Sequence, residues 1–195
     1  MASLIRQYSI DGLDIDIEEE VDISVPLRLM NALHRDFGQD FIITMTPLSS
    51  ALSSKTGQNL SGFSYFELDT LATVPGSDKK LVSWYNAMFY GNFPRGPPTY
   101  DAVIDAGWDP DRIVMAVLDN SENGPPNGFR YIEDLQSSIE GFKEIYPEFG
   151  GVAGWEYYNA GGSDSDNMQP WQWFTSVGNA VFAKEPRSTV IRDEI

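Results

Sequence analysis

Three carboxylates recur with a period of two residues near the start of this sequence. Asp14, Asp16 and Glu18 alternate with branched apolar residues in the run Asp11-Gly12-Leu13-Asp14-Ile15-Asp16-Ile17-Glu18. Because alternate side chains of a β-strand share a face, the acids would line one side and the aliphatic residues the other, buried side. The acids would stand roughly 6–7 Å apart and raise one another's pKa values, an arrangement typical of acid–base chemistry.

The overall composition narrows what this acidic face could bind. The chain has 195 residues, of which 42% are hydrophobic, so it can form a globular domain with a substantial core. Its formal net charge of −16 argues against binding of nucleic acid or of an anionic membrane through a basic face, and is compatible with a neutral sugar as substrate. There are no cysteines, which excludes disulfides and thiolate chemistry.

The acidic run does not fit a calcium-binding loop. Counted from Asp14, Glu19 stands at the sixth position, where that loop needs glycine, and Val25 at the twelfth, where it needs glutamate. We therefore expect no metal ion and no cofactor. No apolar run approaches the roughly 20 residues of a membrane span, and the opening residues MASLIRQYSI lack the apolar core of a signal peptide. Taken from Met1, the chain is expected not to be secreted, and its compartment stays open.

Positioning of these acids requires a scaffold, and the chain reads as alternating strands and helices. The predicted strands are Ile10–Ile17, Phe41–Thr46, Leu81–Tyr90, Arg112–Leu118 and Gly151–Tyr157. The predicted helices are Val25–Phe37, Gly62–Thr73, Tyr100–Ala106, Tyr131–Tyr146 and Pro170–Phe182. Such alternation predicts a parallel sheet, whose long loops after the strands form the active face in α/β barrels. Glu18, Tyr90 and Trp155 all fall near the C-terminal end of a predicted strand.

The acidic run resembles the DGxDxDxE signature on the fourth barrel strand of family 18 glycoside hydrolases, the chitinases and endo-β-N-acetylglucosaminidases. Later segments are similar to the family's fifth, sixth and eighth strands and to the helix that follows in fungal-type members: Ile42–Pro47, Trp84–Tyr90, Gly151–Asn159 and Pro170–Trp173. The resemblance covers nearly all of residues 8–182. It implies an incomplete (β/α)8 TIM barrel of about five βα units, corresponding to strands 4–8.

The resemblance also implies roles for individual residues. Glu18 would be the general acid, Asp16 would hydrogen-bond the substrate's acetamido N–H, and Asp14 would share a proton with Asp16. Tyr90 would hydrogen-bond the acetamido carbonyl, and Trp155 would form an apolar floor under the sugar. Met88 and Asn92 complete the expected substrate-binding set. Strand parity agrees with these roles, since the acids share one face of their strand and Met88 shares a face with Tyr90.

The chain departs from the family pattern in two ways. After the sixth-strand tyrosine the family usually has Asn or Asp, whereas here Gly91 stands there and is followed by Asn92. The counterparts of strands one to three are absent, and with them a serine that normally hydrogen-bonds into the acidic group. We therefore expect the inner acids to lack a partner, and the outer strands to have open edges that promote self-association.

Several residues also have interpretations without function. The acidic run could be a solvent-facing edge strand, and Tyr90 or Trp155 could be core residues. The other tryptophans are interpreted as packing residues: Trp84, Trp108, Trp171 and Trp173.

The expected organisation is a partial catalytic domain over residues 1–183, followed by a charged, loose tail over 184–195. The expected function is endo-hydrolysis of β-1,4 bonds at N-acetylglucosamine, in chitin, chitooligosaccharides or the chitobiose core of N-glycans. The expected partner is therefore an N-acetylglucosamine-containing oligosaccharide or polysaccharide. The alternative is an inactive fragment or sugar-binding remnant.

Overall fold

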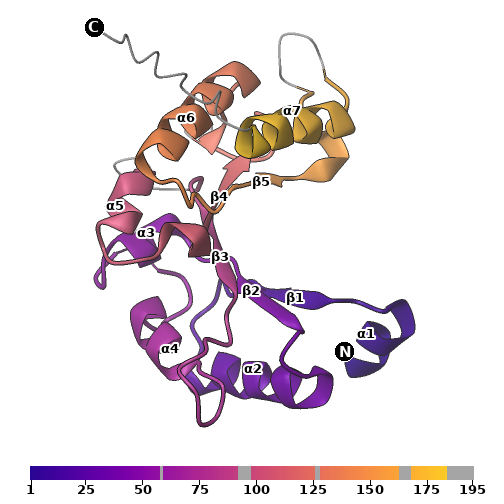
Figure 1. The fold of residues 1–195 in the computed structure, drawn as a ribbon, viewed down its shortest axis with the longest axis vertical. Coiled ribbons are helices and arrows are strands. Elements are labelled where there is room, and N and C mark those ends of the chain that lie inside the picture. Colours follow the sequence, from indigo (N-terminus) through magenta and orange to yellow (C-terminus); the bar gives the residue numbers. More distant parts are fainter. Residues whose placement is uncertain (58, 92–97, 126–127, 163–167, 184–195) are drawn as a thin grey trace, which may run out of the picture.

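The computed structural model describes residues 1–57, 59–91, 98–125, 128–162 and 168–183. Its centre is a five-stranded parallel sheet in the order β1-β2-β3-β4-β5. The strands are β1 (Gly12–Ile15), β2 (Ile42–Met45), β3 (Trp84–Met88), β4 (Ile113–Leu118) and β5 (Val152–Trp155). The sheet and its helices form an open arc with β1 and β5 near its two ends (Figure 1). This is an incomplete TIM barrel, as the sequence predicts.

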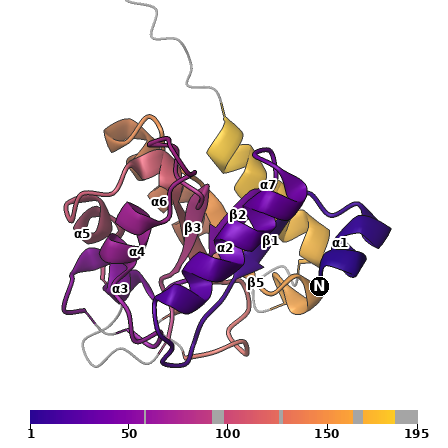
Figure 2. The same ribbon diagram turned by 90° about the horizontal axis from the view of Figure 1, so that it is seen from below.

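Helices connect the strands and cover the sheet. They are α1 (Ala2–Tyr8), α2 (Ser24–Phe37), α3 (Ser49–Ser53), α4 (Tyr65–Leu71), α5 (Tyr100–Ile104), α6 (Ile132–Ile145) and α7 (Pro170–Phe182), with short 3-10 helices η1 (Pro110–Arg112) and η3 (Tyr157–Asn159). Figure 2 shows α3, α4 and α5 together on one side of β3. The helical periodicity predicts α2, α4, α5, α6 and α7, but not α1 or α3. Within the ranges described, no helix is long and apolar enough to cross a bilayer.

The strands are shorter than the sequence pattern predicts, and this changes where two of the acids lie. β1 ends at Ile15, whose carbonyl oxygen accepts a hydrogen bond from the Thr46 amide at 3.2 Å. Asp16 and Glu18 therefore belong to the segment that follows β1 and not to the strand itself. The alternation of side chains is nevertheless kept: Ile15 is buried in the core, while Asp14 and Asp16 stay partly accessible to solvent on the opposite side.

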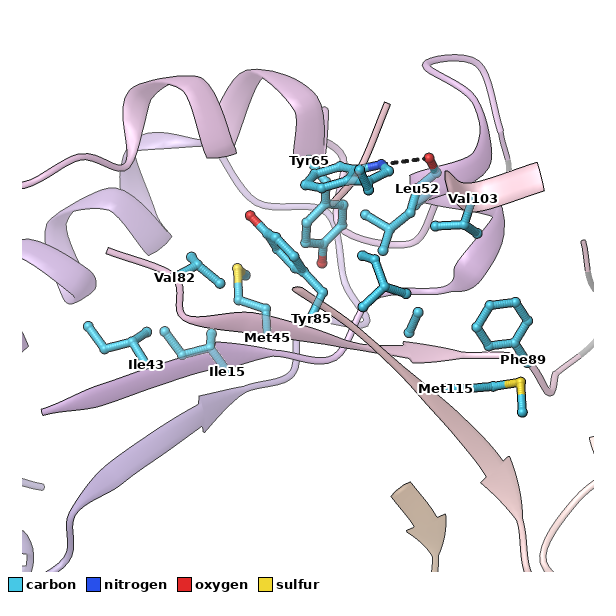
Figure 3. Packing of buried hydrophobic residues seen from close by; sticks show 14 of the residues in the cluster. Ile15, Ile43, Met45, Leu52, Tyr65, Val82, Tyr85, Phe89, Val103 and Met115 are labelled. Carbon is cyan, nitrogen blue, oxygen red and sulfur yellow. Dashed lines mark hydrogen bonds between the residues drawn. The ribbon is translucent and has the colours of Figure 1, made fainter. Parts of the chain in front are cut away.

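The hydrophobic core lies between the sheet and its helices. Ile15, Ile43, Met45 and Tyr85 project from three neighbouring strands into this layer (Figure 3), and each is at most 7% exposed. Burial of such side chains stabilises a fold by about 1.5–3 kcal/mol each. One face of each strand thus packs in the core. The opposite face, which carries the polar residues, points to the inside of the barrel.

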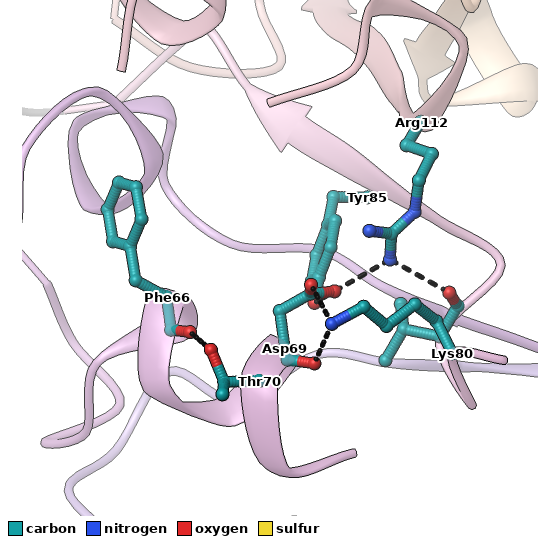
Figure 4. Close-up of polar contacts among 7 residues, drawn as sticks. Phe66, Asp69, Thr70, Lys80, Tyr85 and Arg112 are labelled. Atoms are coloured by element: carbon teal, nitrogen blue, oxygen red, sulfur yellow. Dashed lines mark hydrogen bonds and ion pairs between the residues drawn. The ribbon is translucent and has the colours of Figure 1, made fainter. Parts of the chain in front are cut away.

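A partly buried ionic cluster holds α4 against the sheet (Figure 4). Asp69 of α4 accepts hydrogen bonds at one carboxylate oxygen from Arg112 at 2.7 Å and from the Tyr85 hydroxyl at 2.9 Å. Its other oxygen lies 3.0 Å from the Lys80 ammonium. Although burial opposes ionisation, the hydrogen bonds from Arg112 and Lys80 hold the pKa of Asp69 below its ordinary value. This cluster satisfies its charges internally and is structural.

Candidate active site

A pocket of ≈ 470 Å³ lies on the inner side of the barrel, and all five strands or the segments after them contribute to it. Its lining residues are Asp14, Asp16, Glu18, Thr46, Asn86, Met88, Tyr90, Ala116, Ala153, Gly154 and Trp155. These include every site residue expected from the sequence except Asn92, which lies outside the described residues. The structure therefore brings together side chains from three separate parts of the chain.

Asp14 is held by three hydrogen-bond donors. The Thr44 and Thr46 hydroxyls donate to its two carboxylate oxygens at 2.6 Å each, and the Asn86 amide donates at 2.9 Å. The expectation that the inner acids lack a partner is therefore wrong for Asp14, because β2 and β3 supply donors in place of the missing strands. Three donors fix the position of this carboxylate beside the other two acids.

Asn86 is itself oriented by a neighbour on β3. The Trp84 indole N–H donates to the Asn86 side-chain oxygen at 3.1 Å, which leaves the Asn86 amide nitrogen to face Asp14. Thr44, Thr46 and Asn86 were not among the residues predicted from the sequence. The sequence does contain a pattern that could identify them. Asn86 and Met88 lie two residues apart and so share a face of their strand, and Thr44 and Thr46 do the same on the second strand.

Asp16 has the electrostatic environment predicted for the acidic group. Partial burial raises its pKa to about 6, and the charges of Glu18 and Asp14 act in the same direction. The Asp16 carboxyl group therefore titrates near pH 6, within the pH range in which many enzymes are active. A group of this kind in a pocket is a candidate for catalysis.

The Tyr90 hydroxyl is also affected by the charges of the acidic group. Burial raises the pKa of its hydroxyl, and the negative charges of Asp16 and Glu18 raise it further. The hydroxyl is therefore protonated at neutral pH and can donate a hydrogen bond into the pocket. The next residue, Gly91, has φ 128°, a conformation that side chains rarely adopt, which gives a backbone reason for glycine where the family usually has Asn or Asp.

Trp155 and Met88 supply the apolar part of the pocket. Trp155 follows Gly154 at the end of β5 and is 52% exposed, so the interpretation of Trp155 as a core residue is wrong. Met88, at the end of β3, is only 5% exposed and lines the pocket near Tyr90. An exposed aromatic face beside a group of acids is suited to packing against the apolar face of a ring.

Asp119 is a buried acid close to the site that the sequence pattern did not single out. It follows β4 and is 0% exposed, with one carboxylate oxygen that has no hydrogen-bond partner in the described part of the chain. Burial raises its pKa to about 7, and the charge of Glu156 adds to this effect. Asp119 does not line the pocket, but it lies behind Gly154, which does.

Several solved structures resemble this chain over about nine-tenths of its length. The chitinase ChiC from Aspergillus fumigatus is 36% identical, with a TM-score of 0.71, over 90% of this chain and 60% of that chain. A fungal endo-beta-N-acetylglucosaminidase from glycosyl hydrolase family 18 is 32% identical, with a TM-score of 0.74, over 91% of this chain and 59% of that chain. A family GH18 chitinase from Chromobacterium violaceum, 16% identical with a TM-score of 0.67, shares the fold.

No protein-family model matches the chain, and no curated protein does. The chain spans about 60% of the length of the two more similar structures. The structural likeness and the identity extend over nine-tenths of its own residues. The chain is therefore similar, over nine-tenths of its own residues, to members of glycoside hydrolase family 18, and its five strands match part of that family's barrel.

Proposed function

We propose that the pocket is the acid–base and substrate-orienting part of a glycosidase site. Its reaction is endo-hydrolysis of β-1,4 bonds next to N-acetylglucosamine, in chitin, chitooligosaccharides or the chitobiose core of N-glycans. The observation that carries the proposal is the meeting of the three acids with Tyr90 and Trp155 around one pocket. The similarity to a chitinase and to an endo-beta-N-acetylglucosaminidase supports the substrate class.

The proposed reaction is substrate-assisted. Most glycosidases use two carboxylates, whereas this family is an exception in which the substrate supplies the nucleophile. Glu18 donates its proton to the glycosidic oxygen while the substrate's acetamido oxygen attacks the anomeric carbon. The bond from that carbon to the leaving oxygen breaks, and an oxazolinium ion forms. Water then attacks the anomeric carbon, the bond from that carbon to the acetamido oxygen breaks, and the water gives a proton to Glu18. The acid is restored, and the two successive inversions retain the configuration.

Asp16 and Asp14 would support the acetamido group during this step. Asp16, as a carboxylate, accepts a hydrogen bond from the acetamido N–H and stabilises the positive charge that develops on the ring. Asp14, already held by three donors, tunes Asp16 through its charge. Because the acids lie so close together, they are expected to titrate as a coupled group.

Tyr90, Met88 and Trp155 would orient the sugar. The protonated Tyr90 hydroxyl donates to the acetamido carbonyl and aligns it for attack, an effect of orientation. Trp155 forms an apolar floor for the pyranose ring, and Met88 an apolar wall. A contact from Asn92 to the acetamido group stays a prediction.

A second function, sugar binding without hydrolysis, is favoured by one observation. The acids lie on and after β1, which has a neighbouring strand on one side only within the described sheet. A groove that lacks one wall can still hold a sugar against Trp155 and Tyr90. It would hold the scissile bond less firmly over Glu18.

The test compares two fluorogenic trisaccharides with the same β-1,4 linkage, one of N-acetylglucosamine and one of glucose. They differ at C2, where only the first carries an acetamido group. Substrate assistance predicts that the N-acetylated substrate is hydrolysed at least about 100-fold faster. Similar rates on both would contradict the mechanism. Binding of N-acetylchitotriose without turnover would favour the sugar-binding function.

A further inference from the structure

A hydrogen-bonded group of polar residues joins the ends of β4 and β5 behind the pocket. The Asn123 side-chain amide donates to the Asp119 carboxylate at 3.2 Å, to the Asn159 side-chain oxygen at 3.0 Å and to the Trp155 carbonyl oxygen at 2.8 Å. Asn159 donates back to the Asn123 side-chain oxygen at 2.7 Å. Both the oxygen and the nitrogen of the Asn123 side-chain amide are thus hydrogen-bonded, and the nitrogen donates to the backbone of Trp155.

The backbone around Trp155 is fixed from the same side. The Asp119 amide donates to the Trp155 carbonyl oxygen at 3.2 Å, so this oxygen accepts two hydrogen bonds. The Asp119 carbonyl oxygen accepts a hydrogen bond from the Gly161 amide at 2.9 Å, which ties the segment after η3 to the end of β4. The peptide that carries the pocket's tryptophan is therefore held by residues that do not line the pocket.

The Trp155 side chain depends on this backbone support more than a core tryptophan would. It is 52% exposed, whereas Trp173 and Trp108 are buried among many neighbours. A half-exposed ring has solvent on one side, so its direction is set largely by the backbone from which it projects. A small rotation of the Trp155 peptide would move the indole relative to Glu18 and Asp16.

We propose that Asn123, oriented by Asp119 and Asn159, is a positioning residue that fixes the direction of the Trp155 indole in the pocket. The proposal deepens the proposed function and rests on it for the identity of the ligand. None of the three polar residues lines the pocket, so their effect on a bound sugar passes through Trp155.

The experiment measures Trp155 directly and then measures sugar binding. The indole N–H resonance of Trp155 is assigned in the full chain from its loss in Trp155→Phe. In Asn123→Ala we expect this resonance to shift or broaden while those of buried Trp108 and Trp173 stay in place. Titration with N-acetylchitotetraose should show about tenfold weaker binding, the loss expected when one hydrogen bond no longer holds the platform.

Tyr85→Phe is the matched control. It removes the hydrogen bond to Asp69, which like that of Asn123 joins two elements, but it lies in the core layer and outside the pocket. We expect it to lower the melting temperature and leave the Trp155 resonance and the sugar affinity unchanged. A general loss of stability would therefore be separated from a change at Trp155.

Asn159→Ala provides a second variant if Asn123→Ala does not fold, because it removes both hydrogen bonds that Asn159 makes to Asn123. An unchanged Trp155 resonance in the folded variants, with wild-type affinity, would overturn the proposal. If the wild-type chain binds no sugar, the proposed function fails, whereas the positioning role is still decided by the resonance alone.

Discussion

The three acids of the pocket have different surroundings although they come from one short run of sequence. Asp14 accepts three hydrogen bonds from β2, β3 and the segment after β2. Asp16 is partly buried beside two like charges and its pKa is raised to about 6. Different environments let similar carboxyl groups take different parts in one reaction. The division of roles in the proposed mechanism follows this difference.

The pKa of Asp16 leads to a prediction about the pH dependence of activity. In the proposed mechanism Asp16 acts as a carboxylate, so the rising limb of the kcat/KM profile should have its inflection at about pH 6. Asp16→Asn should lower kcat/KM by about 100-fold or more and remove that inflection. The measurement is the pH–rate profile on a fluorogenic chitooligosaccharide. An unchanged inflection in the variant would assign the titration to another group.

Asp119 leads to a prediction about stability. Burial raises its pKa from 3.8 to about 7, so the folded chain holds this proton more tightly than the unfolded chain does. The stabilisation is complete below pH 3.8 and is lost as the pH rises through about 7. We expect the unfolding free energy of Asp119→Asn, relative to that of wild type, to increase between about pH 4 and pH 7 and to level off above that. Denaturant titrations at several pH values measure it, and a constant difference would contradict the assignment.

At the scale of elements, most of what the sequence predicts correctly comes from the alternation of apolar and polar side chains along the strands. It divides each strand into a core face and a pocket face, and the structure confirms this for Ile15 against Asp14 and for Tyr85 against Asn86. The alternation is visible in sequence because burial on one face restricts residue type there. The convergence of the acids, Tyr90 and Trp155 on one pocket follows from it.

Other features of the site and fold were not predictable in this way. The hydrogen bonds from Thr44 and Thr46 to Asp14 join residues about thirty positions apart and depend on the register of β1 with β2. The five residues of α3 are too few to show a helical period, and four of them are buried. The end of β1 at Ile15 is set by pairing with β2, which local composition does not reveal.

Two glycines test the packing between β5 and α7. A Cβ on Gly154 would lie 2.5 Å from an Asp119 oxygen and 2.8 Å from the Trp173 ring, so Gly154→Ala should destabilise the chain by about 1–3 kcal/mol. Gly178 of α7 has nothing within 4 Å of the corresponding position, and Gly178→Ala should stabilise by up to about 1 kcal/mol. The measurement is the melting temperature of each of the two variants, compared with that of the wild-type chain. Equal effects would show that Gly154 is not closely packed.

At the scale of the whole molecule, the described sheet has two edge strands. β1 and β5 each pair with one neighbour, and the chain spans about 60% of the length of its more similar relatives. A closed barrel has no such edges, because its first and last strands pair with each other. The open edges and the open inner face are the main structural difference between this chain and a complete barrel.

Open edges predict self-association of this chain in solution. Unpaired N–H and C=O groups along β1 and β5 can pair with another copy, so we expect oligomers or poor solubility at micromolar concentration. Light scattering coupled to size-exclusion chromatography measures this directly. A monodisperse monomer that melts cooperatively would contradict the expectation and show that the edges are adequately covered.

The most direct test of the account is turnover of a fluorogenic N-acetylchitotrioside by the wild-type chain and by Glu18→Gln. Glu19→Gln is the matched control, since Glu19 is the adjacent exposed acid and does not line the pocket. We expect wild type and Glu19→Gln to release the fluorophore at similar rates, and Glu18→Gln to bind the sugar but turn it over at least about 1000-fold more slowly. Wild-type turnover no higher than that of Glu18→Gln would contradict the claim that Glu18 is the proton donor of a hydrolase.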